Sequence, residues 1–181
     1  MINELKIDLA CGDNKRSGFK GIDIAQTSST DYVMNLLQFP WDIESECAEE
    51  VNCSHFVEHI PHDIKDGGDS RDGLIQFMDE LYRILKPNGK ATIIVPYLTS
   101  VRAFQDPTHR RFLCKESFYY FNKEWMDVNK LSHYGIKANF DITFSYFISN
   151  ELTLKSEEVR NKAFNNDWNA IDDLIVQLTK L

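Results

Sequence analysis

The chain has 181 residues, of which 43% are hydrophobic and 12% aromatic, and it carries a net charge of −8 at pH 7. A chain of this length can bury one sizeable core and is short for two, so we expect a single domain over residues 1–181. The acidic charge argues against broad contacts with nucleic acid or an anionic membrane, because both depend on a basic surface.

No apolar run approaches the roughly 20 residues that span a membrane. The first ten residues, MINELKIDLA, lack the basic start and the long apolar core of a secretory signal. These features predict a cytoplasmic protein. The four cysteines, Cys11, Cys47, Cys53 and Cys114, show neither C-x-x-C pairing nor zinc-ligand spacing, so reduced thiols are expected.

Residues 6–24, KIDLACGDNKRSGFKGIDI, predict the binding edge of a parallel sheet. A short apolar strand stops at Cys11-Gly12, and a second strand ends on Asp23. Gly12 allows a sharp turn at which the backbone can approach a ligand, and Asp23 offers two acceptor oxygens for both hydroxyls of a ribose. Because ligands bind at the carboxyl ends of such strands, the pattern favours a nucleoside site. The alternative is a generic strand-turn-strand with a solvated aspartate.

The same stretch indicates which nucleoside is bound. A nicotinamide oxidoreductase needs G-x-G-x-x-G, whose later glycines open a helix onto a pyrophosphate. Here one early glycine is followed by Asp13, whose carboxylate repels a pyrophosphate but suits a ligand with a cationic group. S-adenosylmethionine carries a sulfonium and an ammonium and has no phosphate, so it is the expected cofactor.

LACGDNKRSGFKGIDI resembles the first motif of class I S-adenosylmethionine-dependent methyltransferases. In that family the glycine turn lies under the methionine part of the cofactor, and the second acid, here Asp23, binds the ribose. The resemblance implies an α/β fold that is Rossmann-like and doubly wound, with a mostly parallel sheet and a closing antiparallel hairpin. It implies cofactor contacts from Asp8, Ala10, Cys11, Gly12, Asp13, Asp23, Ile24, Asn35, Leu36, His55 and Phe56.

Residues 51–63, VNCSHFVEHIPHD, resemble the fourth-strand motif of the same family, in which an apolar strand precedes Glu-His and an apolar residue. The resemblance places His55 and Phe56 against the adenosine and methionine parts, and Glu58 and His59 just behind them. It also places Asn35, at the end of a short third strand, near the adenine amine, where many relatives have aspartate.

Three histidines close together in this segment, His55, His59 and His62, raise the question of a metal site. Imidazoles four residues apart share a face only in a helix, and Pro61 ends any such helix. We therefore expect no metal site here.

Helical periodicity follows a polar stretch, residues 63–72, which contains Gly67-Gly68 and is expected to be a surface loop; whether it closes over the site stays open. Apolar residues then recur at three and four, which predicts a helix over 74–85. A Lys-Pro-Asn-Gly turn ends it, and residues 90–95, KATIIV, predict a strand buried on both faces. ELYRILKPNGKATIIVP resembles the strand-five motif of the family, in which the turn is structural.

The acceptor side is expected beyond residue 96. Residues 102–115, RAFQDPTHRRFLCK, are basic in an otherwise acidic chain and resemble a motif of small bacterial and phage relatives. One interpretation is a wall for a polar or anionic acceptor. His109 is then the candidate general base, and His59 the second, since a neutral imidazole accepts a proton near pH 7. The alternative is that Asp106 and His109 cap the following helix. The predicted acceptor contacts are Tyr97, Arg102, Asp106, His109 and Arg110.

The remaining sequence predicts structural elements. Residues 115–125 are expected to form an aromatic helix, which is core rather than lid because aromatic stripes usually pack. Residues 139–147 alternate apolar and polar side chains and predict a strand, with residues 151–155 as its antiparallel partner. From residue 157 onward an amphipathic helix is expected, with one apolar side made of Trp168, Ile171, Leu174, Ile175 and Leu178.

Together these patterns predict a methyltransferase that moves a methyl group from S-adenosylmethionine to an unidentified small or polar acceptor by in-line displacement. Such a reaction needs mainly alignment and desolvation. A non-catalytic module that binds S-adenosylmethionine for a regulatory or assembly role is the alternative, because the chain has no large inserted acceptor domain. The acceptor and the oligomeric state stay open.

Overall fold

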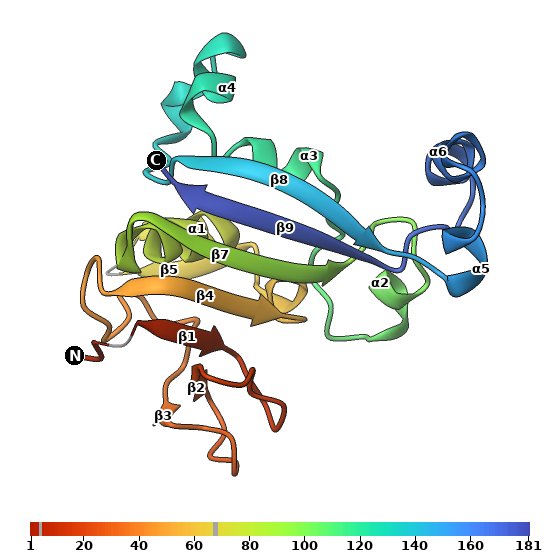
Figure 1. The fold of residues 1–181 in the computed structure, drawn as a ribbon. Coiled ribbons are helices and arrows are strands. Elements are labelled where there is room, and N and C mark those ends of the chain that lie inside the picture. Colours follow the sequence, from red (N-terminus) through yellow and green to blue (C-terminus); the bar gives the residue numbers. More distant parts are fainter. Residues whose placement is uncertain (4, 67–68) are drawn as a thin grey trace.

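A seven-stranded sheet forms the centre of the protein, as the computed structural model shows for the described residues 1–3, 5–66 and 69–181 (Figure 1). In sheet order the strands are β3 (Tyr32–Val33), β2 (Lys20–Asp23), β1 (Lys6–Leu9), β4 (Ala48–Ser54), β7 (Leu85–Pro96), β9 (Asp173–Lys180) and β8 (Phe140–Phe147). The first five strands run parallel, and β9 is antiparallel to both of its neighbours. The predicted α/β fold with a mostly parallel sheet is confirmed.

The helices are short, apart from α1 and α6. They are η1 (Val57–His59), α1 (Gly73–Ile84), α2 (Arg102–Gln105), α3 (Glu116–Tyr119), α4 (Lys123–Val128), η2 (Ser132–Tyr134), α5 (Asn150–Thr153) and α6 (Glu157–Asn166). Helix α1 matches the predicted helix and buries its apolar side, including Phe77 and Leu81, against the sheet. Asp72 is its N-cap, and the carboxylate of Asp72 accepts hydrogen bonds from the backbone amides of Leu74 and Ile75.

The predicted turn at residues 86–89 lies inside strand β7 as a bulge. Leu85 pairs with Ala48 and Lys90 with Glu50, so β7 holds more residues than β4 between these two pairs. Asn88 adopts a positive φ of 62° there, and a Cβ on Gly89 would lie 2.8 Å from the carbonyl oxygen of Lys86. The bulge explains why the segment reads as a helix stop followed by a strand.

The predicted C-terminal helix begins at residue 157 as expected, but the prediction was wrong beyond residue 166. Helix α6 ends at Asn166, and the last element is strand β9, which lies between β7 and β8 (Figure 1). Leu174 and Leu178 satisfy helical spacing, but Leu174, Val176 and Leu178 also alternate with period two, and all three are buried. Because these side chains are buried where β9 lies between β7 and β8, the segment forms a strand and not a helix. The predicted partner strand 151–155 is wrong as well, because α5 occupies most of it and β9 is the antiparallel partner of β8.

Two other predicted segments divide into smaller elements. Residues 63–72 contain the antiparallel strands β5 (Asp63–Asp66) and β6 (Asp69–Asp72) instead of an irregular loop, while Gly67-Gly68 lie outside the described residues. The aromatic segment forms α3 and α4, with Asn122 as the N-cap of α4. Phe118 and Phe121 are fully buried, so its central aromatics belong to the core as predicted.

The two faces of the sheet differ in their environment. One face carries the core, with Leu9, Cys53, Ile93 and Val176 aligned across four strands. The opposite face is polar: one row across five strands consists of Asp8, Asn52, Thr92, Gln177 and Thr143. The described connections between β1 and β4 contain no helix, so these connections do not cover the polar face with a helix.

This open face enlarges the surface. The solvent-accessible area is 9970 Å², whereas a compact monomer of this mass, 21.0 kDa, has about 9000 Å². In the described part of the chain, no helix has both the length and the apolar character that a bilayer crossing requires.

Candidate functional site

Two adjoining cavities lie where β1, β2 and β4 end. The first, of about 190 Å³, is lined by Ala10, Asp23, Ile24, Met34, Asn35, Leu36, Leu37 and Phe56. The second, of about 270 Å³, is lined by Asp8, Ala10, Cys11, Asn14, Asn52, Ser54 and His55. They share Ala10, so together they form one elongated site at the carboxyl-terminal edge of the sheet. This is the edge at which open α/β sheets bind ligands.

The carboxylate of Asp23 is held by two backbone amides. Gly12 N–H donates to Oδ2 and Ala25 N–H donates to Oδ1, both at 2.9 Å. An ionised carboxylate has about four acceptor positions, so about two remain for donors of a ligand. Asp23 therefore lies in the first cavity with a fixed orientation and free acceptor capacity.

The turn after β1 is built from left-handed backbone. Ala10 has a φ of 55° and Gly12 a φ of 52°. For alanine this conformation costs roughly 1–2 kcal/mol, and Ala10 is the residue that lines both cavities. The sequence indicated the glycine, but nothing in it indicated a strained alanine.

Asp8 and Asn52 form a buried polar pair on neighbouring strands. Asn52 Nδ2 donates to Oδ1 of Asp8 at 2.7 Å, and Arg16 N–H donates to Oδ2 at 2.7 Å. Asp8 therefore ties the loop after β1 to the edge of the sheet. Asn52 was missed by sequence reasoning; the available signal was a single amide side chain inside the buried strand VNCS.

The structure brings most of the predicted cofactor residues together. Nine of the eleven line the two cavities, all except Gly12 and Asp13. Gly12 contributes its amide to Asp23, and Asp13 is exposed. Asn35 lies at the predicted end of the third strand, and its Oδ1 accepts a hydrogen bond from Leu37 N–H at 3.0 Å. Besides Asn52, the lining residues that sequence reasoning missed are Asn14, Met34, Leu37 and Ser54.

The predicted acceptor residues do not line these cavities. Arg102 forms a 2.7 Å ion pair with Asp173. Tyr97 packs edge-on against Tyr146, and burial raises its pKa. Arg110 is exposed. Their role as an acceptor wall stays a prediction.

Asp106 and His109 do not cap the following helix, so that alternative was wrong. Asp106 accepts hydrogen bonds from the backbone and hydroxyl of Thr108, and these bonds lower its pKa. Nδ1 of His109 lies 2.9 Å from the carbonyl oxygen of Ala103, so His109 bonds back to the preceding helix α2. The fold instead places its ring edge-on to that of His59, with centroids 4.7 Å apart.

The three histidines considered as a metal site are not brought together. The side chain of His62 is 68% exposed and lies beside Asp72. His55 Nδ1 lies 3.4 Å from Oε1 of Glu58, and this carboxylate raises the pKa of the ring. Glu58, His59 and His109 form the cluster instead, with one donor atom of each within 4.8 Å of the others.

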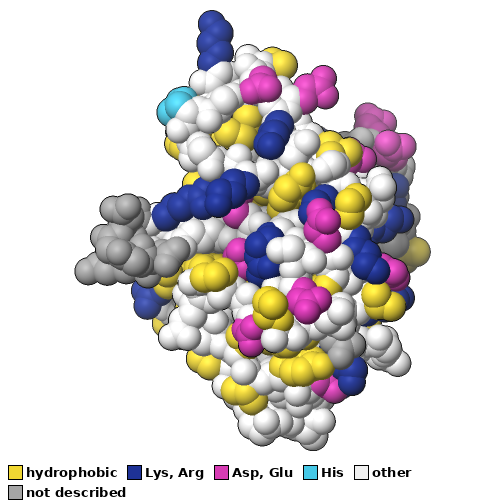
Figure 2. Space-filling model, turned by 90° about the vertical axis from the view of Figure 1, so that its left-hand side faces the viewer, with side chains coloured by type: hydrophobic (Ala, Val, Ile, Leu, Met, Phe, Trp, Pro, Cys, Tyr) yellow, Lys and Arg dark blue, Asp and Glu magenta, His cyan; other side chains and the backbone are white. Residues whose placement is uncertain are grey.

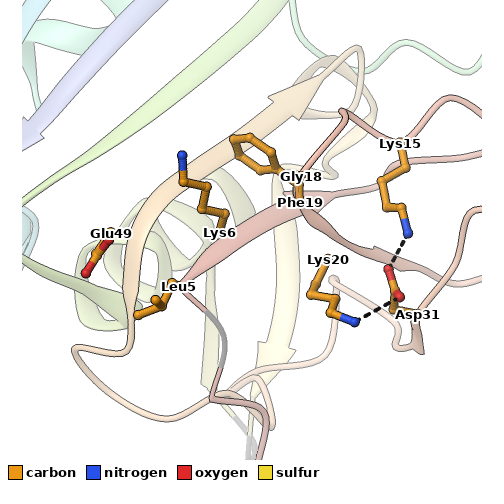
Figure 3. Close-up of a pocket in the computed structure, with 8 residues that line it drawn as sticks. All are labelled: Leu5, Lys6, Lys15, Gly18, Phe19, Lys20, Asp31 and Glu49. Atoms are coloured by element: carbon orange, nitrogen blue, oxygen red, sulfur yellow. Dashed lines mark hydrogen bonds and ion pairs between the residues drawn. The ribbon is translucent and has the colours of Figure 1, made fainter.

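A separate cavity of about 500 Å³ lies near the starts of β1 and β2 (Figure 3). Asp31 accepts from Lys15 at 2.6 Å and lies 3.4 Å from Lys20, while Lys6 pairs with Glu50. The hydrogen bonds from Lys15 and from Gly21 N–H lower the pKa of Asp31 to about 2. Each lysine of this cavity is thus paired with a carboxylate, which argues against an anion site. Figure 2, which views the side of the molecule where these strands begin, likewise shows basic and acidic side chains interspersed.

Solved structures provide a comparison for this fold. The chain is similar to an S-adenosylmethionine-dependent methyltransferase from Archaeoglobus fulgidus, with a TM-score of 0.66, 21% identity, and coverage of 98% of this chain and 86% of that chain. It is also similar to such a methyltransferase from Mesorhizobium loti, with a TM-score of 0.54, 11% identity and coverage of 98% and 91%. It is similar as well to phosphoethanolamine N-methyltransferase 2 of Haemonchus contortus in complex with S-adenosylmethionine. The TM-score is 0.50 and the identity 14%, with coverage of 98% of this chain and 49% of that chain.

No protein-family model matches the chain, and no curated protein sequence matches it, so the likeness rests on structure. The fold is that of class I S-adenosylmethionine-dependent methyltransferases. Its strand order, with one antiparallel strand between the last two parallel ones, is the feature that the sequence pattern misread.

Proposed function

We propose that the protein binds S-adenosylmethionine in the two adjoining cavities and transfers its methyl group to a small polar acceptor. The observation that carries the proposal is Asp23, a carboxylate with a fixed orientation and free acceptor positions in a largely apolar cavity at the end of β2. The methyltransferase fold is consistent with this function, but the argument for the function rests on the residues of the site.

The lining of the first cavity suits an adenosine. Its lining is mostly apolar, with Phe56, Met34 and Leu36 available to pack against a flat base, and Asp23 available for two ribose hydroxyls. The second cavity is polar and includes Asn14, Ser54 and His55, which suit the amino acid end of the cofactor. Ala10, at the junction, leaves room between the two because its side chain is small.

The chemistry supplied by bound S-adenosylmethionine is a methyl cation equivalent: the S–CH₃ bond breaks as the acceptor's bond to that carbon forms, the electron pair stays on sulfur, and the acceptor releases its proton. The protein's part is to align the acceptor and exclude water. We assign removal of the proton to the imidazoles His109 and His59, which stay the candidate bases. Both have Nδ1 engaged, to Ala103 and Thr108 respectively, which leaves Nε2 free to accept a proton.

The proposal is tested in two stages. Isothermal calorimetry with S-adenosylmethionine and with S-adenosylhomocysteine measures binding to the purified chain, and we expect heat from both. Incubation with methyl-labelled donor and a panel of hydroxyl, carboxyl and amine acceptors then measures transfer. Absence of binding heat for both compounds in folded protein would refute the proposal.

The second stage also distinguishes the proposed enzyme from the alternative, a non-catalytic module that binds S-adenosylmethionine. A module binds both compounds and labels no acceptor on the panel, whereas the enzyme labels at least one. The resemblance to small bacterial and phage relatives is consistent with either result and stays a prediction.

A further inference from the structure

The carboxylate of Glu58 is buried without a hydrogen-bond partner. Its side chain is 3% exposed, and neither oxygen accepts a hydrogen bond within the described part of the chain. An unpaired buried charge costs several kcal/mol, so this position calls for a cation. Nδ1 of His55 lies 3.4 Å from Oε1 of Glu58 but not in hydrogen-bond geometry, so neither Oε1 nor Oε2 has a hydrogen-bond partner.

His109 places an unprotonated ring nitrogen near this carboxylate. Its Nδ1 lies 2.9 Å from the carbonyl oxygen of Ala103, and a carbonyl can only accept, so Nδ1 carries the proton. Nε2 of the neutral ring is therefore unprotonated. It lies 4.0 Å from Oε1 of Glu58.

His59 is oriented in the same way through Thr108. The Thr108 hydroxyl donates its single proton to Oδ1 of Asp106 at 2.7 Å, so its oxygen must accept from Nδ1–H of His59, which lies 2.9 Å away. The lone pair of His59 is then on Nε2 as well. Two imidazoles with their Nδ1 protons engaged by oxygen acceptors thus lie beside one unpaired carboxylate.

We propose that Glu58, His59 and His109 bind a first-row divalent metal ion of the zinc type. Two histidines and one glutamate, with a position left open, are the ligand set of many catalytic zinc sites, and ring N–H bonds to oxygen acceptors are their usual support. Bonds of about 2.1 Å place tetrahedral donor atoms about 3.4 Å apart. The three donor atoms, which lie within 4.8 Å of one another, must therefore close in by roughly 1 Å.

The backbone holds the two parts of the site together. The amides of Arg110 and Arg111 both donate to the carbonyl oxygen of Glu58, at 2.7 and 3.0 Å. The Arg111 side chain donates to the carbonyl oxygens of Ile60 and Pro61. His109 is thus fixed next to η1, which explains how a histidine distant in sequence completes a cluster that the spacing of residues 55–62 did not predict.

The location gives the metal a task that rests on the proposed function. Glu58 lies 3.4 Å from His55, which lines the polar cavity, so a metal ion at Glu58 would lie beside the polar end of the proposed cofactor site. A bound metal ion polarises and acidifies an oxygen ligand. The acceptor would then be a hydroxyl or similar oxygen group. With the ion bound, its acidifying effect would replace the role of base that the proposed function gives to His59 and His109.

The test uses the full chain after chelator treatment and dialysis, titrated with Co²⁺ while the visible absorption of the ion is recorded. We expect one ion per chain with bands of tetrahedral or five-coordinate Co²⁺, displaced by Zn²⁺. Glu58→Gln and His109→Gln should abolish the bands. Thr108→Val, at an exposed position, should weaken affinity about 10-fold by freeing His59. The matched control is His133→Gln, because His133 is exposed and outside the cluster.

Circular dichroism and thermal melting establish that each variant folds. Lack of specific Co²⁺ bands in the folded wild-type chain, or bands that survive Glu58→Gln or His109→Gln, would overturn the inference. S-adenosylmethionine binding is measured by calorimetry on the same samples without metal. Cofactor binding without Co²⁺ binding refutes only the metal site, and Co²⁺ binding without cofactor binding refutes only the proposed function.

Discussion

Gly12 N–H donates a 2.9 Å hydrogen bond to Oδ2 of Asp23, which joins the turn after β1 to the end of β2. This bond makes the turn and the carboxylate one unit, because Ala25 N–H fixes the other oxygen. The site is thus arranged before any ligand enters, which reduces the ordering cost of binding.

Replacing Asp23 should remove cofactor binding. Asp23→Ala deletes two acceptor positions for ribose hydroxyls and frees the Gly12 turn, so we expect S-adenosylmethionine affinity to fall about 100-fold or more, or about 3 kcal/mol for two bonds to a charged group. Calorimetry measures the change. Asp141→Ala, at an exposed position on β8, is the control and should bind as wild type does. Equal affinity in both variants would remove Asp23 from the site.

Ala10 offers a test that separates strain from space. Ala10→Gly should stabilise the fold by up to about 1 kcal/mol, because glycine adopts a φ of 55° without strain, and should leave binding intact. Ala10→Val should destabilise it by about 1–2 kcal/mol and block the junction of the two cavities. Urea unfolding and calorimetry report the two effects. If Ala10→Val binds cofactor normally, the cavities do not form one ligand site.

Arg111 should be structural. Its guanidinium is buried and donates to the carbonyl oxygens of Ile60 and Pro61 and to Asp72, so Arg111→Met should cost about 3 kcal/mol by leaving these acceptors unpaired. Arg110→Met, at the exposed neighbouring position, should change the unfolding free energy by less than about 0.5 kcal/mol. Similar costs for both variants would contradict this assignment.

Asp31 should make stability depend on acidic pH. Its pKa of about 2 lies below the unfolded value, about 3.9. The native state therefore binds fewer protons, and the contribution of Asp31 is present above about pH 4 and is lost as the pH falls toward 2. Solvent screening limits it to about 1 kcal/mol. Urea unfolding at pH 5, 3.5 and 2.5 measures the free energy of unfolding, which should decline less with falling pH for Asp31→Asn than for wild type. Parallel plots of this free energy against pH would refute the prediction.

Local patterns predicted those parts of the molecule that local patterns determine. The turn at Gly12, the acid at Asp23 and the helix over 74–85 each depend on neighbouring residues, and each was found where expected. Strand β9 was misread because Leu174 and Leu178 fit both periods, and only its position between two strands selects one of them.

The candidate site shows the same division. Asn52 and His109 acquire their partners through tertiary contacts, Asn52 with Asp8 across the sheet and His109 with Glu58 through the backbone bonds of Arg110 and Arg111. No spacing rule connects residues so far apart in sequence. The cluster of Glu58, His59 and His109 could therefore not be read from the histidines near residue 55.

The polar face of the sheet determines how the protein should unfold. Since β7, β9 and β8 already present Thr92, Gln177 and Thr143 to water, denaturation exposes less new apolar area than in a three-layer domain of the same mass. The heat-capacity increment and the denaturant m-value should both be small for 181 residues.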